Sequence, residues 1–203
     1  MYKLSFSPAS PYVRKVRMAA FKAGLDKKLE LITANTQDEK DDIRSLNPLG
    51  KIPIVTKPDG SSLFDSRVII DHFNRVGGGL IPDNGDDRDT VLTRAALVEG
   101  LIDASLLIVY SDRYAGGETP SKVWADLQKG KIDRTLDFLE NDLTNWSNPI
   151  GFDLANIGLA TALGYLIFRE VRDWKTNRPK MQEWYQNIGS NLPGFDETKP
   201  YSA

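Results

Sequence analysis

The sequence predicts an α/β half followed by an all-helical half. Residues 1–80 alternate short apolar runs with helical periodicity in the order βαβ and then ββα. The polar stretch Ile81–Asp89 is rich in turn formers and shows no periodicity, as expected for a linker. Every periodic segment after it has helical spacing, which indicates a helical bundle. We therefore expect a first domain over 1–80, a linker over 81–90 and a second domain over 91–203.

Short apolar runs and turn residues define the elements of the first half. The expected strands are Leu4–Phe6, Leu29–Ala34, Ile52–Val55 and Leu63–Phe64. Apolar residues at helical spacing from Val13 to Phe21 predict a helix between the first two strands, with Gly24 as its left-handed cap. The acid-rich stretch 37–44 predicts a loop and a weak helix. A second helix is expected to open at Asp65-Ser66 and to end at Gly77–Gly79.

The second half contains four helical patterns and a short tail. The expected helices run from Thr90 to about Tyr114, from Ser121 to about Leu143, from Asp153 to Arg169, and from Pro179 to about Ile188. Asp153 is the expected N-cap of the third of these, with Asn156 three residues on. The tail from Leu192 onward contains two prolines and is expected to be loose.

Composition excludes several classes of function. The chain has 203 residues, 40% of them hydrophobic and 27% charged, with a formal net charge of -2, which is ordinary for a globular protein. No basic patch interleaved with aromatics appears, and no apolar run approaches the roughly 20 residues of a membrane span, so neither nucleic acid nor membrane is an expected partner. The N-terminus lacks a signal-peptide pattern, so we expect a cytoplasmic protein.

The absence of cysteine restricts the chemistry further. It excludes disulfides, thiolate metal sites and a protein thiol as nucleophile. The single histidine, His72, cannot build a metal site alone, so we expect no bound metal. On its helix, His72 is expected to pack or to form a hydrogen bond.

Ser10-Pro11 marks a helix start that could also bind an anion. Proline is favoured at the first helical position, and serine is a favoured N-cap. A hydroxyl at the positive end of a helix, directly after a strand, is well placed to meet a negative charge. If that charge were a thiolate, the hydroxyl could donate to it and lower the pKa of the thiol.

Two further segments indicate a groove for a small peptide. Proline cannot donate to a strand ladder, so Pro53 within Gly50–Ile54 predicts a cis Ile52–Pro53 bond that leaves the Ile52 backbone as a free edge. At Asp65-Ser66, a capping side chain is the simplest interpretation. A carboxylate and a hydroxyl at that helix start could also hold an amino acid's ammonium and carboxylate groups together.

Three segments in this order resemble the bacterial glutathione S-transferase family: Phe6–Val16, Asn47–Pro53 and Asp65-Ser66. Each motif alone is weak, but the ordered set covers the N-terminal half at the expected spacing. The resemblance implies a thioredoxin-like, glutathione-binding N-terminal domain and an all-helical C-terminal domain that contributes the electrophile pocket. It also implies a soluble homodimer that uses glutathione as co-substrate and needs no other cofactor.

The resemblance assigns roles to five residues of the first half. Ser10 is implied to be the catalytic residue that stabilises the thiolate of glutathione. The backbone of Ile52 is implied to pair with the cysteinyl part of glutathione, beside cis Pro53. Asp65 and Ser66 are implied to hold the γ-glutamyl group, although Asp65 stands where the family more commonly has the longer Glu or Gln.

For the second substrate, a small hydrophobic electrophile, we expect a pocket that includes Tyr12, Tyr110 and Tyr114. Tyr110 and Tyr114 are four residues apart on one helix face, where simple packing is the alternative role. Two other functions stay open. One is a glutathione-dependent disulfide reductase or peroxidase in which both thiols come from glutathione, and the other is a non-catalytic glutathione-fold interaction module.

Overall fold

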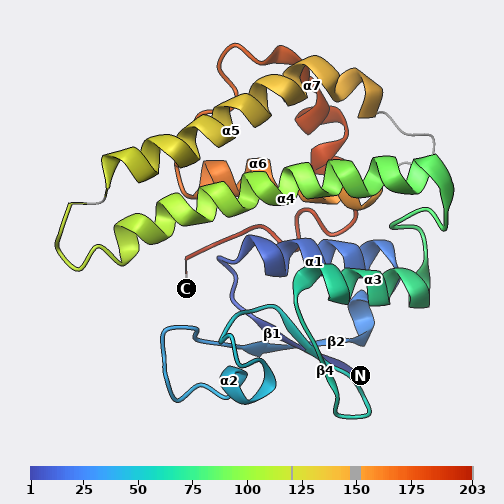
Figure 1. Cartoon of the computed structure of the whole chain (residues 1–203). Helices are drawn as coiled ribbons and strands as arrows, with labels where there is room; N and C mark the ends of the chain where they lie inside the picture. Colours follow the sequence, from blue (N-terminus) through green and yellow to red (C-terminus); the bar gives the residue numbers. More distant parts are fainter. Residues whose placement is uncertain (120, 147–151, 203) are drawn as a thin grey trace. The chain divides into compact units, whose positions relative to one another are not determined.

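The computed structural model describes residues 1–119, 121–146 and 152–202 (Figure 1). The chain divides into two compact units, which we call unit 1 (Met1–Gly85 with Leu192–Ala203) and unit 2 (Asp86–Asn191). The expected second domain ran to the end of the chain without a break. The structure instead groups the residues after Asn191 with unit 1. Within the described residues, no helix is both long and apolar enough to cross a membrane.

Unit 1 is built on a mixed four-stranded sheet of order β2-β1-β3-β4. The strands are β1 (Tyr2–Phe6), β2 (Leu29–Thr33), β3 (Ile54–Thr56) and β4 (Ser62–Leu63). β1 runs parallel to β2 and antiparallel to β3, and β4 is antiparallel to β3. A parallel pair needs a crossover, and the helix predicted between the first two strands provides it.

Two helices of unit 1 pack side by side and run in the same direction (Figure 1). These are α1 (Pro11–Lys22) and α3 (Ser66–Gly77), and a short α2 (Ile43–Leu46) precedes β3. At their C-terminal ends the helices approach so closely that a Cβ on Gly77 would lie 2.2 Å from the carbonyl oxygen of Ala23. Only glycine fits there. Because the C-terminal ends meet, both helix N-termini lie at the opposite, common end of unit 1.

The C-terminal segment is docked on α1, whereas the sequence predicted a loose tail. The buried Arg14 guanidinium donates to the Phe195 carbonyl at 3.3 Å and to Thr198 Oγ1 at 3.5 Å, and it lies 4.8 Å from the centre of the Phe195 ring. Arg17 donates to the Glu197 carbonyl at 2.9 Å. The prediction of a loose tail was wrong, because two arginines on α1 supply donors that proline-rich composition does not reveal.

Unit 2 is helical throughout its described part. Its helices are α4 (Gly85–Arg113), α5 (Lys122–Asp142), α6 (Leu154–Phe168) and α7 (Pro179–Asn187). Every residue of α6 from Leu154 to Leu166 is buried, so this helix forms the centre of the unit. Asp153 caps α6 by accepting from the Asn156 N–H at 2.9 Å. The Glu140 carboxylate of α5 accepts from the Lys180 and Met181 amides at 3.0 and 2.9 Å, which satisfies the first turn of α7.

The predicted fold class is confirmed, while some boundaries differ. α4 begins at Gly85, although the sequence suggested that the linker extends to Asp89. Asp86 and Asp87 occupy its first turn, where acidic side chains are favoured by the helix dipole, so their polarity misled the linker assignment. β3 begins at Ile54, because Ile52 and Pro53 precede the ladder.

We predict that Thr198→Val destabilises unit 1 by about 1–3 kcal/mol, because it removes an acceptor from a buried guanidinium. Hydrogen–deuterium exchange should become faster in peptides of α1 while peptides of α5 keep their protection. All four tryptophans lie in unit 2, so tryptophan fluorescence serves as an internal reference for the unit that should not change. Glu197→Gln is the matched control, since Arg17 binds the backbone carbonyl of that residue. Unchanged exchange in α1 would contradict a docked tail.

We also predict that His72 titrates below its ordinary pKa of 6.5, because burial lowers this pKa and the charges of Arg75 and Lys57 add to the effect. The neutral ring is in contact with Tyr2, whose hydroxyl lies 3.1 Å from His72 Nε2. Since the folded pKa is below the unfolded one, stability falls as the pH drops through 6.5 towards the folded value. The chain has one histidine, so a single proton NMR signal reports the midpoint. A midpoint at or above 6.5 would disprove this, and His72→Gln should remove the slope.

Candidate functional site

The register of the sheet brings three distant segments to one edge. Ser5, near the end of β1, pairs with Ile54, the first residue of β3, and Leu63, the last residue of β4, pairs with Val55. The segments that follow β1, precede β3 and follow β4 therefore meet at the same edge of the sheet. These are the segments that carry Ser10, Ile52-Pro53 and Asp65-Ser66. The structure thus places all five sequence-predicted residues of unit 1 at one end of that unit.

Ser10 caps α1 in a way that leaves its hydroxyl hydrogen available. Its Oγ accepts from the Val13 N–H at 3.3 Å, and its backbone carbonyl accepts from the Arg14 N–H at 3.0 Å. A serine hydroxyl has one donor hydrogen and two acceptor lone pairs, so capping uses only an acceptor. Within the described residues, no acceptor is bonded to the Ser10 hydrogen. The cap function and a donor function are therefore compatible.

The Ile52–Pro53 bond is cis, as the sequence predicted. The loop before it is held by the buried Asn47, whose side-chain amide donates to the Lys51 carbonyl at 2.9 Å and whose Oδ1 accepts from the Leu49 N–H at 3.0 Å. In the described part of the chain, the Ile52 backbone forms no hydrogen bond of its own. An unpaired backbone edge beside a sheet can receive an extended peptide. Sequence reasoning did not assign a role to Asn47.

Asp65 and Ser66 form the start of α3. One carboxylate oxygen of Asp65 accepts from the Arg67 N–H at 3.0 Å, and Arg67 Nη2 lies 2.7 Å from the other. The Arg67 side chain holds the pKa of Asp65 below its ordinary 3.8, and the charge of Lys15 contributes to this lowering. Asp65 is therefore ionised at neutral pH. The Phe64–Asp65 bond is also cis, which the sequence did not predict.

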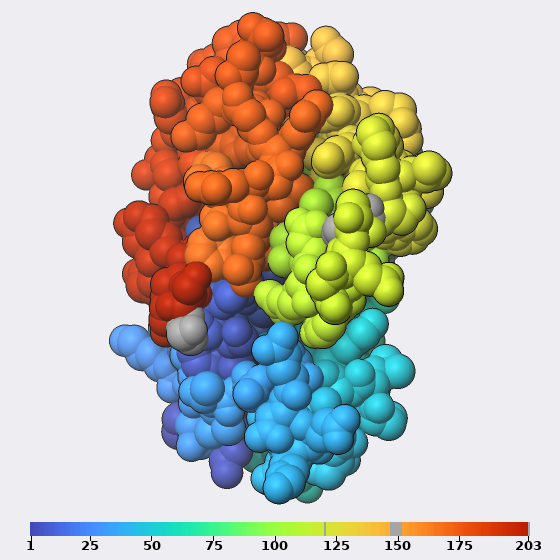
Figure 2. All heavy atoms as spheres, turned by 90° about the vertical axis from the view of Figure 1, so that its left-hand side faces the viewer, coloured from blue at the N-terminus to red at the C-terminus, as the bar shows by residue number. Residues whose placement is uncertain are grey.

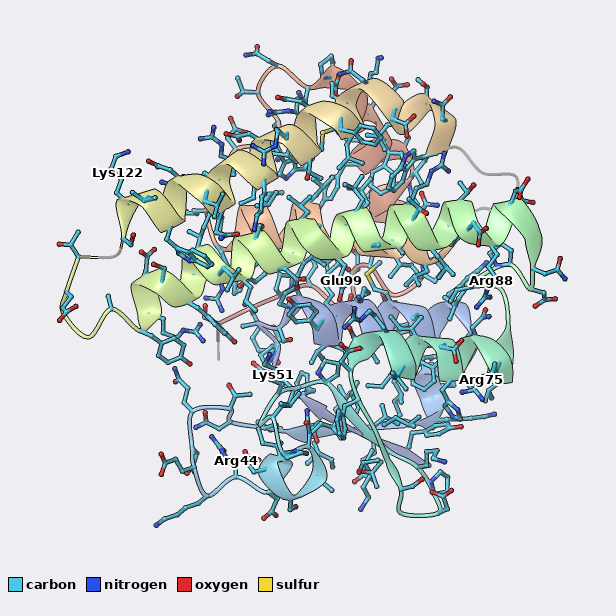
Figure 3. All side chains as sticks on the ribbon, viewed as in Figure 1. Arg44, Lys51, Arg75, Arg88, Glu99 and Lys122 are labelled. Carbon is cyan, nitrogen blue, oxygen red and sulfur yellow. The ribbon has the colours of Figure 1, made fainter. Side chains whose placement is uncertain are left out.

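The surface around these residues is exposed at the end of unit 1 where α1 starts. Figure 2 faces this end: the dark blue residues around the start of α1 lie between the light blue segment before β3 and the red end of the chain. Lys51, directly before Ile52, is exposed and projects at the same end (Figure 3). Lys51, Arg67 and Lys15 place positive charge around the start of α1, which suits an anionic ligand.

The three tyrosines of the expected electrophile pocket lie in different units. Tyr12 is the second residue of α1 in unit 1. Tyr110 and Tyr114 are together at the C-terminal end of α4 in unit 2, with ring centres 5.4 Å apart and nearly perpendicular. Sequence analysis missed the neighbours of this pair, Tyr165 and Arg169 at the end of α6. No sequence signal could have found them, since more than 50 residues separate them from Tyr110 and Tyr114.

Two hollows of unit 2 lie apart from these tyrosines. One, of about 310 Å³, is lined by residues of α4 and α5, among them Leu97 and Phe138. Another of about 310 Å³ is lined by Leu166 and the segment up to Lys175. Both are shallow depressions without convergent groups for catalysis, so chemistry favours the tyrosine face. Within the described ranges, no group of three or more His, Asp and Glu side chains is arranged to hold a metal.

A mixed sheet with two helices packed against it, followed by a helical unit, is the architecture of the soluble glutathione transferases. Residues 9–76 match the family model of the glutathione S-transferase N-terminal domain. The uncharacterized GST-like protein YibF of Escherichia coli K12 is 31% identical over 206 residues, covering 99% of this chain and 100% of that protein. The chain belongs to the glutathione transferase family.

Solved structures extend the similarity over the whole chain. A glutathione transferase family member from Pseudomonas fluorescens Pf-5 with bound glutathione is 37% identical, with a TM-score of 0.90 and 100% coverage of both chains. A second structure of that protein holds S-(propanoic acid)-glutathione, at a TM-score of 0.86 and with 99% of this chain covered. The thioredoxin-like first unit and the helical second unit are therefore both features of this family.

Proposed function

We propose that this chain is a glutathione S-transferase in which Ser10 stabilises the glutathione thiolate. The observation that carries the proposal is the free hydrogen of the Ser10 hydroxyl at the N-terminus of α1. Because thiolate is the nucleophilic form of a thiol, a hydrogen bond to the anion and the positive end of the helix both increase its fraction. Ser10 donates this hydrogen bond and does not itself attack.

The rest of glutathione fits the same end of unit 1. The Ile52 backbone, beside Pro53, would pair with the cysteinyl residue as a short strand. The Asp65 carboxylate, which is ionised, would accept from the γ-glutamyl ammonium, and Ser66 would bind the carboxylate of that residue. The relative from Pseudomonas fluorescens that binds glutathione supports this choice of ligand.

The second substrate would be a small, largely hydrophobic electrophile recognised by Tyr12, Tyr110 and Tyr114. The thiolate sulfur forms a bond to carbon, and in a substitution the departing group leaves with the electron pair of the bond that breaks. The enzyme contributes a lowered thiol pKa and proximity. The relative that holds S-(propanoic acid)-glutathione supports a ligand substituted at sulfur.

The remaining parts of the proposal concern assembly and location. We expect a homodimer, which size-exclusion chromatography with light scattering would test. Because glutathione keeps cytosolic thiols reduced, the proposal places the enzyme in the cytoplasm. A glutathione-dependent reductase or peroxidase would release glutathione disulfide instead of a thioether, so mass spectrometry of the products distinguishes the two reactions. Binding of glutathione without either product would indicate a non-catalytic module.

We predict that Ser10→Ala raises the pKa of bound glutathione by roughly one unit or more and lowers kcat/KM about tenfold to a hundredfold at neutral pH, because a hydrogen bond to a charged group is lost. The ultraviolet absorbance of the thiolate and the pH profile of kcat/KM measure both effects. Stability should fall by about 1 kcal/mol through loss of the cap.

The matched control is Ser121→Ala. Ser121 caps α5 in the same way, accepting from the Trp124 N–H at 3.3 Å, so its replacement costs a similar stability and should leave the thiol pKa unchanged. Equal activity of the Ser10 variant and the parent would reduce Ser10 to a cap and reject the mechanism.

We predict that Asp65→Ala and Ser66→Ala each weaken glutathione binding about tenfold while kcat at saturating glutathione changes little. Contacts far from the sulfur are equally strong in ground and transition states, so their loss raises KM. Isothermal titration calorimetry gives the dissociation constants. Asp65→Asn keeps a capping oxygen and removes the charge, and it therefore separates helix capping from ammonium binding. Parent affinity in both alanine variants would place the ligand elsewhere.

A further inference from the structure

Two helices of unit 2 end beside one another and gather arginine and tyrosine side chains there. α6 packs tightly on α4, since a Cβ on Gly158 would lie 2.5 Å from Val98 Cγ2. At the end of α4, the Arg113 guanidinium carbon is 5.3 Å from the centre of the Tyr110 ring. The charges of Arg113 and Arg169 both act on Tyr110, so the ends of α4 and α6 form one electrostatic neighbourhood.

The two arginines differ from most other basic residues of unit 2 with a printed contact, which are paired with carboxylates. Arg172 pairs with Asp133 and Arg178 pairs with Asp137. Arg113 and Arg169 form no ion pair in the part of unit 2 that the structure describes, and they contact aromatic rings instead. Arg169 lies 4.5 Å from the Phe168 ring centre, and its buried Nε has no hydrogen-bond partner among the described residues. Each guanidinium carries five N–H donors, so unused donors are concentrated here.

The tyrosines of this neighbourhood add donors without adding negative charge. Burial raises the pKa of Tyr110 above its ordinary 10.0, and the neighbouring Tyr114 adds to the effect while both arginines oppose it. Burial likewise raises the pKa of Tyr165, against the charge and hydrogen bond of Arg169. Both phenols are therefore protonated at neutral pH. The face offers N–H and O–H donors together with positive charge, which is the complement of a carboxylate.

We propose that Tyr110, Arg113 and Arg169 form a carboxylate subsite, so that the electrophile of this enzyme is an unsaturated carboxylic acid. The inference rests on the proposed transferase function and narrows its second substrate. A purely hydrophobic electrophile would leave both guanidinium groups without a counter-charge, whereas a carboxylate satisfies them.

The reaction that follows is an addition. The thiolate sulfur forms a bond to the β-carbon of the acid, and the π bond between the α- and β-carbons breaks. Its electron pair moves to the α-carbon, which takes up a proton from water, replacing the proton that the thiol released on ionisation. The product is the sum of glutathione and the acid, and no group leaves.

Two ligands that differ only at the proposed contact test the subsite. S-(2-carboxyethyl)glutathione and S-propylglutathione have substituents of equal length, ending in a carboxylate and a methyl group respectively. Calorimetry on the full-length protein should show that the carboxyethyl conjugate binds about tenfold more tightly or better, because charge-assisted hydrogen bonds replace none. Arg113→Gln and Arg169→Gln should each remove most of this preference while the dissociation constants of glutathione and S-propylglutathione stay unchanged.

Arg172→Gln is the control, because this arginine lies in the same unit, is paired with Asp133 and should keep the full preference. Tyr110→Phe keeps the ring and removes one donor, so it tests the subsite even if an arginine variant fails to fold. Equal affinity of the two conjugates for the parent, or a preference kept in the Tyr110 and arginine variants, would overturn the subsite while glutathione binding leaves the transferase proposal standing. Loss of binding for glutathione and both conjugates would overturn both proposals.

Discussion

The antiparallel pairing of β1 with β3 is the interaction on which the candidate site depends. With Ser5 opposite Ile54, the chain leaves β1 and enters β3 at the same edge of the sheet. Side-chain direction alternates along a strand, so a shift of this pairing by one residue would turn Leu4 and Val55, both fully buried, towards the wrong face. Burial of these apolar residues therefore fixes the register, and the register places Ser10 and Ile52 together.

The second constraint is the close contact between α1 and α3. Glycine at position 77 lets the two C-terminal ends approach, and parallel packing then brings both N-termini to one end of unit 1. Positive ends of helices and the cations Lys51 and Arg67 thereby surround a single surface. The docked C-terminal segment holds α1 from its other side, through Arg14 and Arg17. Packing chosen for stability in this way also fixes the electrostatic character of the site.

The sequence predicted those parts of the molecule that local chemistry determines. The cap at Ser10, the cis bond before Pro53 and the strand order of the first half depend on neighbouring residues or on short connections. The docked tail and the approach of Arg169 to Tyr110 depend on contacts across many residues, which no local pattern encodes. Asn156 shows the limit within a motif: its side chain donates to Asp153 Oδ1 at 3.0 Å and its own Oδ1 is buried without a partner among the described residues. A capping box would have used that oxygen as an acceptor, so the motif predicted the helix start and not its hydrogen bonds.

Helix capping by itself does not identify a functional residue in this chain. Ser10, Asp65, Ser121 and Asp153 all cap helices through a side-chain oxygen at the same structural position. Asp153 is buried and uses both its contacts inside unit 2, and Ser121 stands at an exposed helix start. Ser10 and Asp65 differ because the sheet brings their helix starts to the edge where the unpaired Ile52 backbone lies. A common cap becomes a candidate catalytic group through the elements that end beside it, and this explains why three weak motifs in the right order carry more information than any strong one alone.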